Sequence, residues 1–82
     1  MKGSKTMAKK NKVKMIPVES SNANAVGYDS MKKELFVEFR GGALYRYSDV
    51  PKVIFIGLQE TESFGRYLNE KVKGVYSFVK VS

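Results

Sequence analysis

The chain has 82 residues, enough for one small domain, and it contains neither cysteine nor histidine. Disulfide bonds, zinc sites of the Cys/His kind and catalytic sets that need either residue are therefore excluded. The net charge is +7, but six lysines and no acid precede Met15, so residues 15–82 carry only 9 − 8 = +1.

Residues 1–14 form a lysine-rich arm without any aromatic residue. A segment of this composition buries too little apolar surface to fold, so we predict a disordered arm followed by one domain over residues 15–82. One interpretation is an arm that contacts the phosphates of a nucleic acid, and its candidate residues are Lys9, Lys10, Lys12 and Lys14. The other interpretation is a solvated tail or a leader, because Met7 and Met15 are both possible starts.

No apolar run approaches the roughly 20 residues that span a bilayer, and no apolar segment follows the basic start of the chain. We therefore expect neither a membrane span nor a secretory signal. Together with the absence of cysteine, this favours a cytoplasmic protein.

The first half of the domain has the pattern of antiparallel strands. Pro17 is typical of a short strand at a sheet edge, and Leu35, Val37 and Phe39 alternate along the clearest strand of the chain. Gly41-Gly42 indicates a hairpin turn. The expected strands are residues 15–18, 25–29, 34–40 and 44–47.

The second half is predicted to contain two short helices and a last strand. Pro51 fits the first turn of a helix, and residues 63–73 repeat apolar side chains at four-residue spacing before Gly74 ends the pattern. Residues 76–81 alternate again. The fold class is therefore α+β: a small antiparallel sheet, made of a three-strand meander plus a C-terminal strand, with two short helices on one face.

These residues together resemble the KTSC domain, which occurs in small bacterial and phage proteins and at the C-terminus of some lysyl-tRNA synthetases. The similar segments are 18–21, 26–29, 35–39, 42–47, 50–51 and 63–69. The lysine-rich arm lies outside the family pattern, and Leu68 stands where an aromatic residue is common. The resemblance implies RNA binding through its synthetase context, and the central Tyr-x-Tyr of the family corresponds to Tyr45 and Tyr47.

Tyr45, Arg46 and Tyr47 are the main candidates for ligand binding. Aromatic side chains on an open sheet stack bases, and a neighbouring arginine meets phosphate, which suits RNA or one free nucleotide. The alternative is that both tyrosines belong to the core.

The register of the hairpin decides between these alternatives. A two-residue turn at Gly41-Gly42 places both tyrosines on the face opposite Val37. A three-residue turn over residues 40–42 pairs Phe39 with Ala43 and places both tyrosines beside Val37, with Arg46 pointing outward. The second register collects the apolar residues on one face, so the pattern favours tyrosines that lie mostly in the core.

Arg40, Arg66 and Asn69 complete the set of candidate binding residues. Arg66 and Asn69 follow Ser63, where a helix N-terminus would attract an anion; Ser63 as a plain cap is the alternative. We expect a non-enzymatic protein without metal or cofactor that binds RNA or a nucleotide. The alternative is a protein-interaction module, such as a phage-type accessory protein that acts on a host protein or sequesters a small ligand, and homo-oligomerisation stays open.

Overall fold

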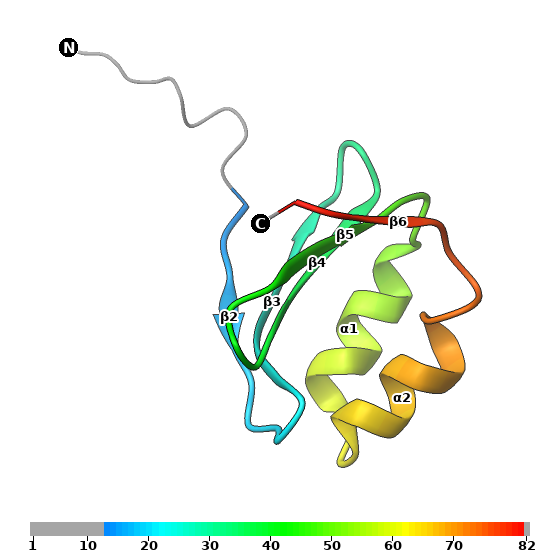
Figure 1. Ribbon diagram of the computed structural model, residues 1–82. Coiled ribbons are helices and arrows are strands. Elements are labelled where there is room, and N and C mark those ends of the chain that lie inside the picture. Colours follow the sequence, from blue (N-terminus) through cyan, green and yellow to red (C-terminus); the bar gives the residue numbers. More distant parts are fainter. Residues whose placement is uncertain (1–12, 82) are drawn as a thin grey trace, which may run out of the picture.

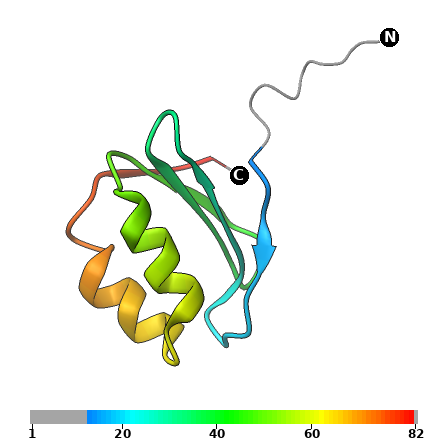
Figure 2. The same ribbon diagram turned by 180° about the vertical axis from the view of Figure 1, so that it is seen from behind.

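The computed structural model describes residues 13–81, which form a five-stranded antiparallel sheet with two helices on one side (Figures 1 and 2). The strands lie in the sheet in chain order. The elements are β2 (Ile16–Pro17), β3 (Ala23–Asp29), β4 (Glu34–Phe39), β5 (Leu44–Tyr47), α1 (Lys52–Glu60), α2 (Phe64–Lys71) and β6 (Phe78–Lys80). The predicted α+β class is confirmed. The sheet has one strand more than a three-strand meander plus a C-terminal strand, because Ile16–Pro17 pairs with β3 along the edge.

The β4–β5 hairpin adopts the three-residue turn that the apolar pattern favours. The Phe39 amide donates to the Ala43 carbonyl at 2.8 Å, and the Gly42 amide donates back to the Phe39 carbonyl at 3.0 Å. Gly41 and Gly42 have φ values of 95° and 97°, a region that side chains disfavour and glycine enters freely. Val37 consequently stands opposite Tyr45, and Leu35 stands opposite Tyr47.

The hydrophobic core lies between the sheet and the two helices. From the sheet it includes Val26, Leu35, Val37 and Tyr47. From the helices and their ends it includes Val50, Leu58, Phe64, Leu68 and Val72. No helix within residues 13–81 is long and apolar enough to cross a membrane.

The opposite face of β3 is approached by the segment that precedes β2. A Cβ atom at Gly27 would lie within 2.7 Å of Val13 Cγ1 and of Met15 Sδ. Glycine at this position therefore lets the chain pass close to the sheet. Val13, which the sequence assigns to the arm, is thus in contact with the domain.

Candidate ligand pocket

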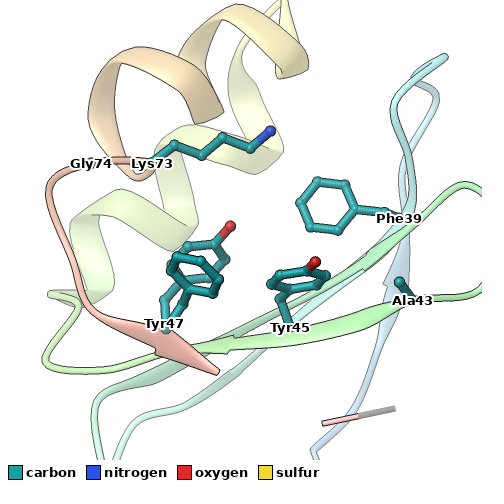
Figure 3. A pocket seen from close by; sticks show the side chains of 7 residues that line it. Phe39, Ala43, Tyr45, Tyr47, Lys73 and Gly74 are labelled. Carbon is teal, nitrogen blue, oxygen red and sulfur yellow. The ribbon is translucent and has the colours of Figure 1, made fainter. Parts of the chain in front are cut away.

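An open pocket of about 440 Å³ lies on the helix-covered face of the sheet, where the helices no longer cover the strands. Its volume is within the range of small-molecule sites. Aromatic side chains dominate the lining, which consists of Phe39, Ala43, Tyr45, Tyr47, Lys73, Gly74 and Phe78 (Figure 3).

The aromatic rings form a connected wall. The ring of Tyr45 meets that of Phe39 edge-on, with 5.3 Å between centroids and 89° between planes. On its other side Tyr45 lies 5.4 Å from Phe78 at a tilt of 36°, and Phe78 lies 5.6 Å from Tyr47. Strand pairing explains this gathering, because Tyr47 stands opposite Phe78 and both side chains point to the helix side.

Lys73 supplies the cation of the pocket. Its Nζ atom lies 5.2 Å from the centroid of the Phe39 ring. Figure 3 shows the Lys73 side chain extending toward that ring. The chain reverses just after it, since Gly74 has a φ of 80° and the amides of Val75 and Tyr76 donate to the Val72 carbonyl at 3.1 Å each. Because of this turn, β6 begins at Phe78 and not at the predicted residue 76. The turn also holds Lys73 above the sheet.

Tyr47 forms the floor of the pocket and belongs to the core, because its side chain is only 2% exposed. Burial raises the pKa of the Tyr47 hydroxyl above its ordinary value, and the neighbouring Tyr45 raises it further. The phenol is therefore neutral at physiological pH. Tyr45 is half-buried and lines the pocket.

Of the predicted binding residues, the structure brings Tyr45 and Tyr47 together in this pocket but not Arg46. Arg46 stands opposite Phe36 on the other face of the sheet, as the favoured register predicts. Its Nε atom lies 3.8 Å from a carboxylate oxygen of Glu34 and makes no hydrogen bond with the described residues.

Arg40 is at the hairpin, where its side chain is already used. Its Nε and Nη2 atoms donate to the Ser20 carbonyl at 3.1 Å and 2.7 Å. These bonds hold the hairpin against the loop before β3. They use two of the five N–H donors of the guanidinium.

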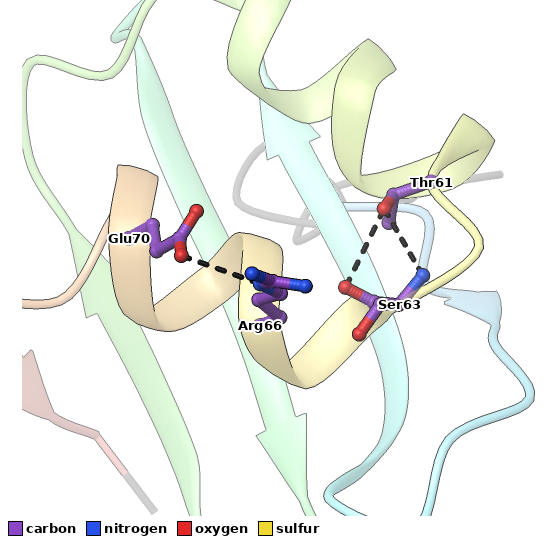
Figure 4. Close-up of polar contacts among 4 residues, drawn as sticks. All are labelled: Thr61, Ser63, Arg66 and Glu70. Carbon is purple, nitrogen blue, oxygen red and sulfur yellow. Dashed lines mark hydrogen bonds and ion pairs between the residues drawn. The ribbon is translucent and has the colours of Figure 1, made fainter.

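Arg66 and Asn69 lie on α2 and line a separate polar groove of about 590 Å³. Lys73, which lines the aromatic pocket, follows the end of α2 and does not line this groove. The Arg66 Nε atom pairs with Glu70 at 3.4 Å (Figure 4). Ser63 occupies the N-cap position without a side-chain cap, and its amide instead donates to the Thr61 hydroxyl at 3.1 Å.

Charge distinguishes the polar groove from the aromatic pocket. Three carboxylates, those of Glu19, Glu62 and Glu70, line the polar groove beside Arg66. Among the described residues that line the aromatic pocket there is a lysine and no carboxylate. An anion is therefore better accommodated in the aromatic pocket.

The predicted arm lysines fall partly outside the described residues. Lys9, Lys10 and Lys12 lie there, whereas Lys14 is described and exposed. Within the described range, no three Asp or Glu side chains gather closely enough to hold a metal ion.

Sequence reasoning missed Phe39, Lys73 and Phe78 as pocket residues. Phe39 was assigned to the core by its alternation with Leu35 and Val37. Lys73 and Phe78 come from the turn after α2 and from the last strand, and only the tertiary fold brings them beside β5. The one local signal was the alternation of residues 76–81, which places Phe78 and Lys80 on the same face.

The fold and the pocket define a small α+β domain with an aromatic site open to solvent. The family model of the KTSC domain matches residues 19–76. The chain therefore belongs to the KTSC domain family, as its resemblance predicted.

Three similar proteins illustrate the range of this family. A protein of Tsukamurella paurometabola is 48% identical over 59 residues, covering 72% of this chain and 88% of the relative. A lysine–tRNA ligase of Nostoc punctiforme is 28% identical over 68 residues, which are 83% of this chain but only 12% of the ligase. The crystal structure of a KTSC domain protein from Yersinia pestis superposes with a TM-score of 0.83 and 28% identity, covering 87% of this chain and all (100%) of that protein.

Proposed function

We propose that this KTSC domain binds single-stranded RNA or a nucleotide in the aromatic pocket, without catalysing a reaction. The observation that carries the proposal is the wall of aromatic rings beside Lys73, which lines a pocket of about 440 Å³. Stacking of a base on an aromatic side chain contributes about 1–3 kcal/mol and tolerates any sequence. A cytoplasmic location follows from such a ligand.

The base would stack against the wall formed by the rings of Phe39, Tyr45 and Phe78, which contact one another. The 89° angle between Phe39 and Tyr45 forms a corner, so a planar base stacks on one ring while its edge contacts the other. The hydroxyls of Tyr45 and Tyr47 offer hydrogen bonds to the polar edge of the base.

The phosphate would lie at the open rim of the pocket. Lys73, the lysine in the pocket lining, would contribute its ammonium there. The Lys73 ammonium already sits over the Phe39 ring, so a cationic ligand would be repelled from the same corner. An anionic, ring-bearing ligand fits both features.

The test is a titration of a fluorescently labelled single-stranded RNA oligonucleotide, with an unlabelled mononucleotide as competitor. Lys73→Met should weaken binding about tenfold, the effect expected for removal of one charge-assisted hydrogen bond. It should also reduce the log–log salt slope by about 0.7, the share of one phosphate neutralised on a single strand. Lys71→Met is the matched control, because Lys71 is exposed in the last turn of α2 and outside the pocket.

The arm adds a separable contribution to the same titration. If the arm lysines meet phosphates, removal of residues 1–12 should lower the salt slope by about 0.7 for each phosphate that the arm neutralises, and it should leave the effect of Lys73→Met intact. The shorter chain keeps Val13, which lies against Gly27. Absence of RNA and nucleotide binding at low salt, or equal binding by the Lys73 and Lys71 variants, would contradict the proposal.

The second candidate function is protein interaction, and the exposed apolar side chains of Phe78 and Val79 on β6 favour it. In that case the pocket binds neither RNA nor nucleotides, and the chain binds a partner protein through the sheet edge formed by β6. The same titration distinguishes the two candidates, because only the first predicts a response to Lys73→Met.

A further inference from the structure

The two edge strands of the sheet differ in how they are protected. At one edge, β2 has two residues, and one of them is Pro17, which cannot donate a backbone hydrogen bond. At the other edge, β6 contains neither proline nor a bulge, and its one charged residue is Lys80, which stands opposite Tyr45. An edge strand presents unpaired N–H and C=O groups to which another strand can pair.

Hydrogen bonding to β5 shows which groups of β6 stay free. The Val81 amide donates to the Leu44 carbonyl at 2.8 Å, and the Ser77 carbonyl accepts from the Ser48 amide at 2.9 Å. Val79 stands between them, opposite Arg46. Because these groups alternate along an antiparallel strand, the N–H and C=O groups of Phe78 and Lys80 point outward. No strand among residues 13–81 pairs with that side.

We propose that β6 pairs with β6 of a second copy, antiparallel about a two-fold axis at Val79. This operation places Phe78 opposite the partner's Lys80, and Lys80 opposite the partner's Phe78. Each pair exchanges both of its outward backbone hydrogen bonds, so the free donors and acceptors of the edge satisfy one another. The outward backbone groups of β6 are therefore complementary to those of β6 in a second copy.

The side chains complement one another on both faces of the joined sheet. On the helix side, the partner's Lys80 reaches the ring of Phe78, which is 55% exposed in the single chain, and cations are attracted to such a ring. On the opposite side, Val79 meets the partner's Val79, and both are 47% exposed when alone. Pairing thus covers the apolar residues that β6 leaves in water.

The proposed dimer also extends the rim of the ligand pocket. Phe78 lines the pocket, and the partner's Lys80 would lie next to the Phe78 ring at the rim of the pocket. Both pockets would lie on the same side of one continuous sheet, because the two-fold axis runs perpendicular to the sheet at β6. The dimer itself requires no ligand.

The test is sedimentation velocity of the full chain over a dilution series, with two variants at one position. Lys80→Pro removes an outward N–H and no hydrogen bond to β5, and proline is tolerated where an edge N–H faces solvent. Lys80→Ala keeps the N–H and removes only the cation. The wild type should sediment with twice its 9.3 kDa mass at high concentration. Lys80→Ala should still dimerise, and Lys80→Pro should stay monomeric.

Hydrogen exchange of the wild type provides a second measurement that does not depend on any variant. The amides of Phe78 and Lys80 should be protected at high concentration and lose that protection on dilution. The amides of Val79 and Val81 should stay protected throughout, because they donate to β5. A wild type that is monomeric at every concentration, a dimer that survives Lys80→Pro, or exchange at residues 78 and 80 that ignores concentration would each overturn the proposal.

Discussion

Tyr45 and Tyr47 stand two residues apart on the same strand and the same face of the sheet, yet their surroundings differ. Tyr47 is packed with Leu35 in the region that the helices cover. Tyr45 lies beyond that region, against Phe39 and Phe78, where the pocket is open. The same alternation thus produces a core residue, Tyr47, and a pocket residue, Tyr45. The difference is that the helices cover the sheet at Tyr47 and end before Tyr45.

The difference arises because α2 ends at Lys71 and the chain turns back at Gly74. Up to Val72, helical side chains fill the space above the sheet. Just beyond it, Lys73 extends over the Phe39 ring at the open pocket. A sheet face that is longer than its helices leaves aromatic residues available for a ligand.

The largest expected effect is that of Tyr47→Ala. Removal of a fully buried aromatic side chain costs about 3–5 kcal/mol, which equals the whole net stability expected of a domain this small. The variant should therefore be largely unfolded by circular dichroism. Tyr47→Phe keeps the ring and serves as control. A cooperatively folded Tyr47→Ala variant would show that Tyr47 is not part of the core.

High pH should destabilise the protein through the same residue. Burial raises the pKa of Tyr47 in the folded state, so its stabilising contribution is fully present below the unfolded pKa of about 10 and is lost as pH rises through the higher folded value. Denaturant unfolding followed from neutral to alkaline pH measures this loss.

Tyr47→Phe should weaken the alkaline decrease without abolishing it. Burial, and to a smaller degree Asp29, also raises the pKa of Tyr28, whose hydroxyl donates to the Val50 carbonyl. Tyr28 therefore still contributes in the variant. Identical alkaline profiles for wild type and Tyr47→Phe would show that the Tyr47 hydroxyl is not held neutral by burial.

Tyr45→Ala should have a smaller effect on stability and a larger effect on binding. Its half-buried ring should contribute about 1–2 kcal/mol, so the variant folds with a lowered melting temperature. Removal of one stacking ring should weaken binding of the RNA or nucleotide by about 1–3 kcal/mol. Arg46→Met is the matched control, because it changes the adjacent residue on the opposite face. Equal weakening of ligand binding in both variants would contradict the distinction between the two faces.

The fold was predictable from the sequence to a large degree, because local patterns determine it. The alternation of Leu35, Val37 and Phe39 and the two glycines after them predicted the strand, the turn and the register. Pro17 predicted a short edge strand over residues 15–18, and the structure has β2 (Ile16–Pro17) at that edge, paired with β3.

The candidate site was predictable only in part. Tyr45 and Tyr47 were identified from their spacing, and Arg46 was expected to point outward on the favoured register. Lys73 and Phe78 were not identified, because each is more than 25 residues from Tyr45 along the chain and no local period links them. Their proximity is a consequence of where α2 ends and of how β6 pairs with β5.

The most direct test of the account is NMR chemical-shift mapping of the chain during titration with a mononucleotide and with a short single-stranded RNA. We expect the largest shifts at Phe39, Tyr45, Lys73 and Phe78, with intermolecular contacts between the base and the Tyr45 or Phe78 ring. Phe36 and Arg46, on the opposite face, should shift little. Shifts centred on that opposite face, or on Arg66 and Asn69 in the polar groove, would contradict the assignment of the aromatic pocket as the ligand site.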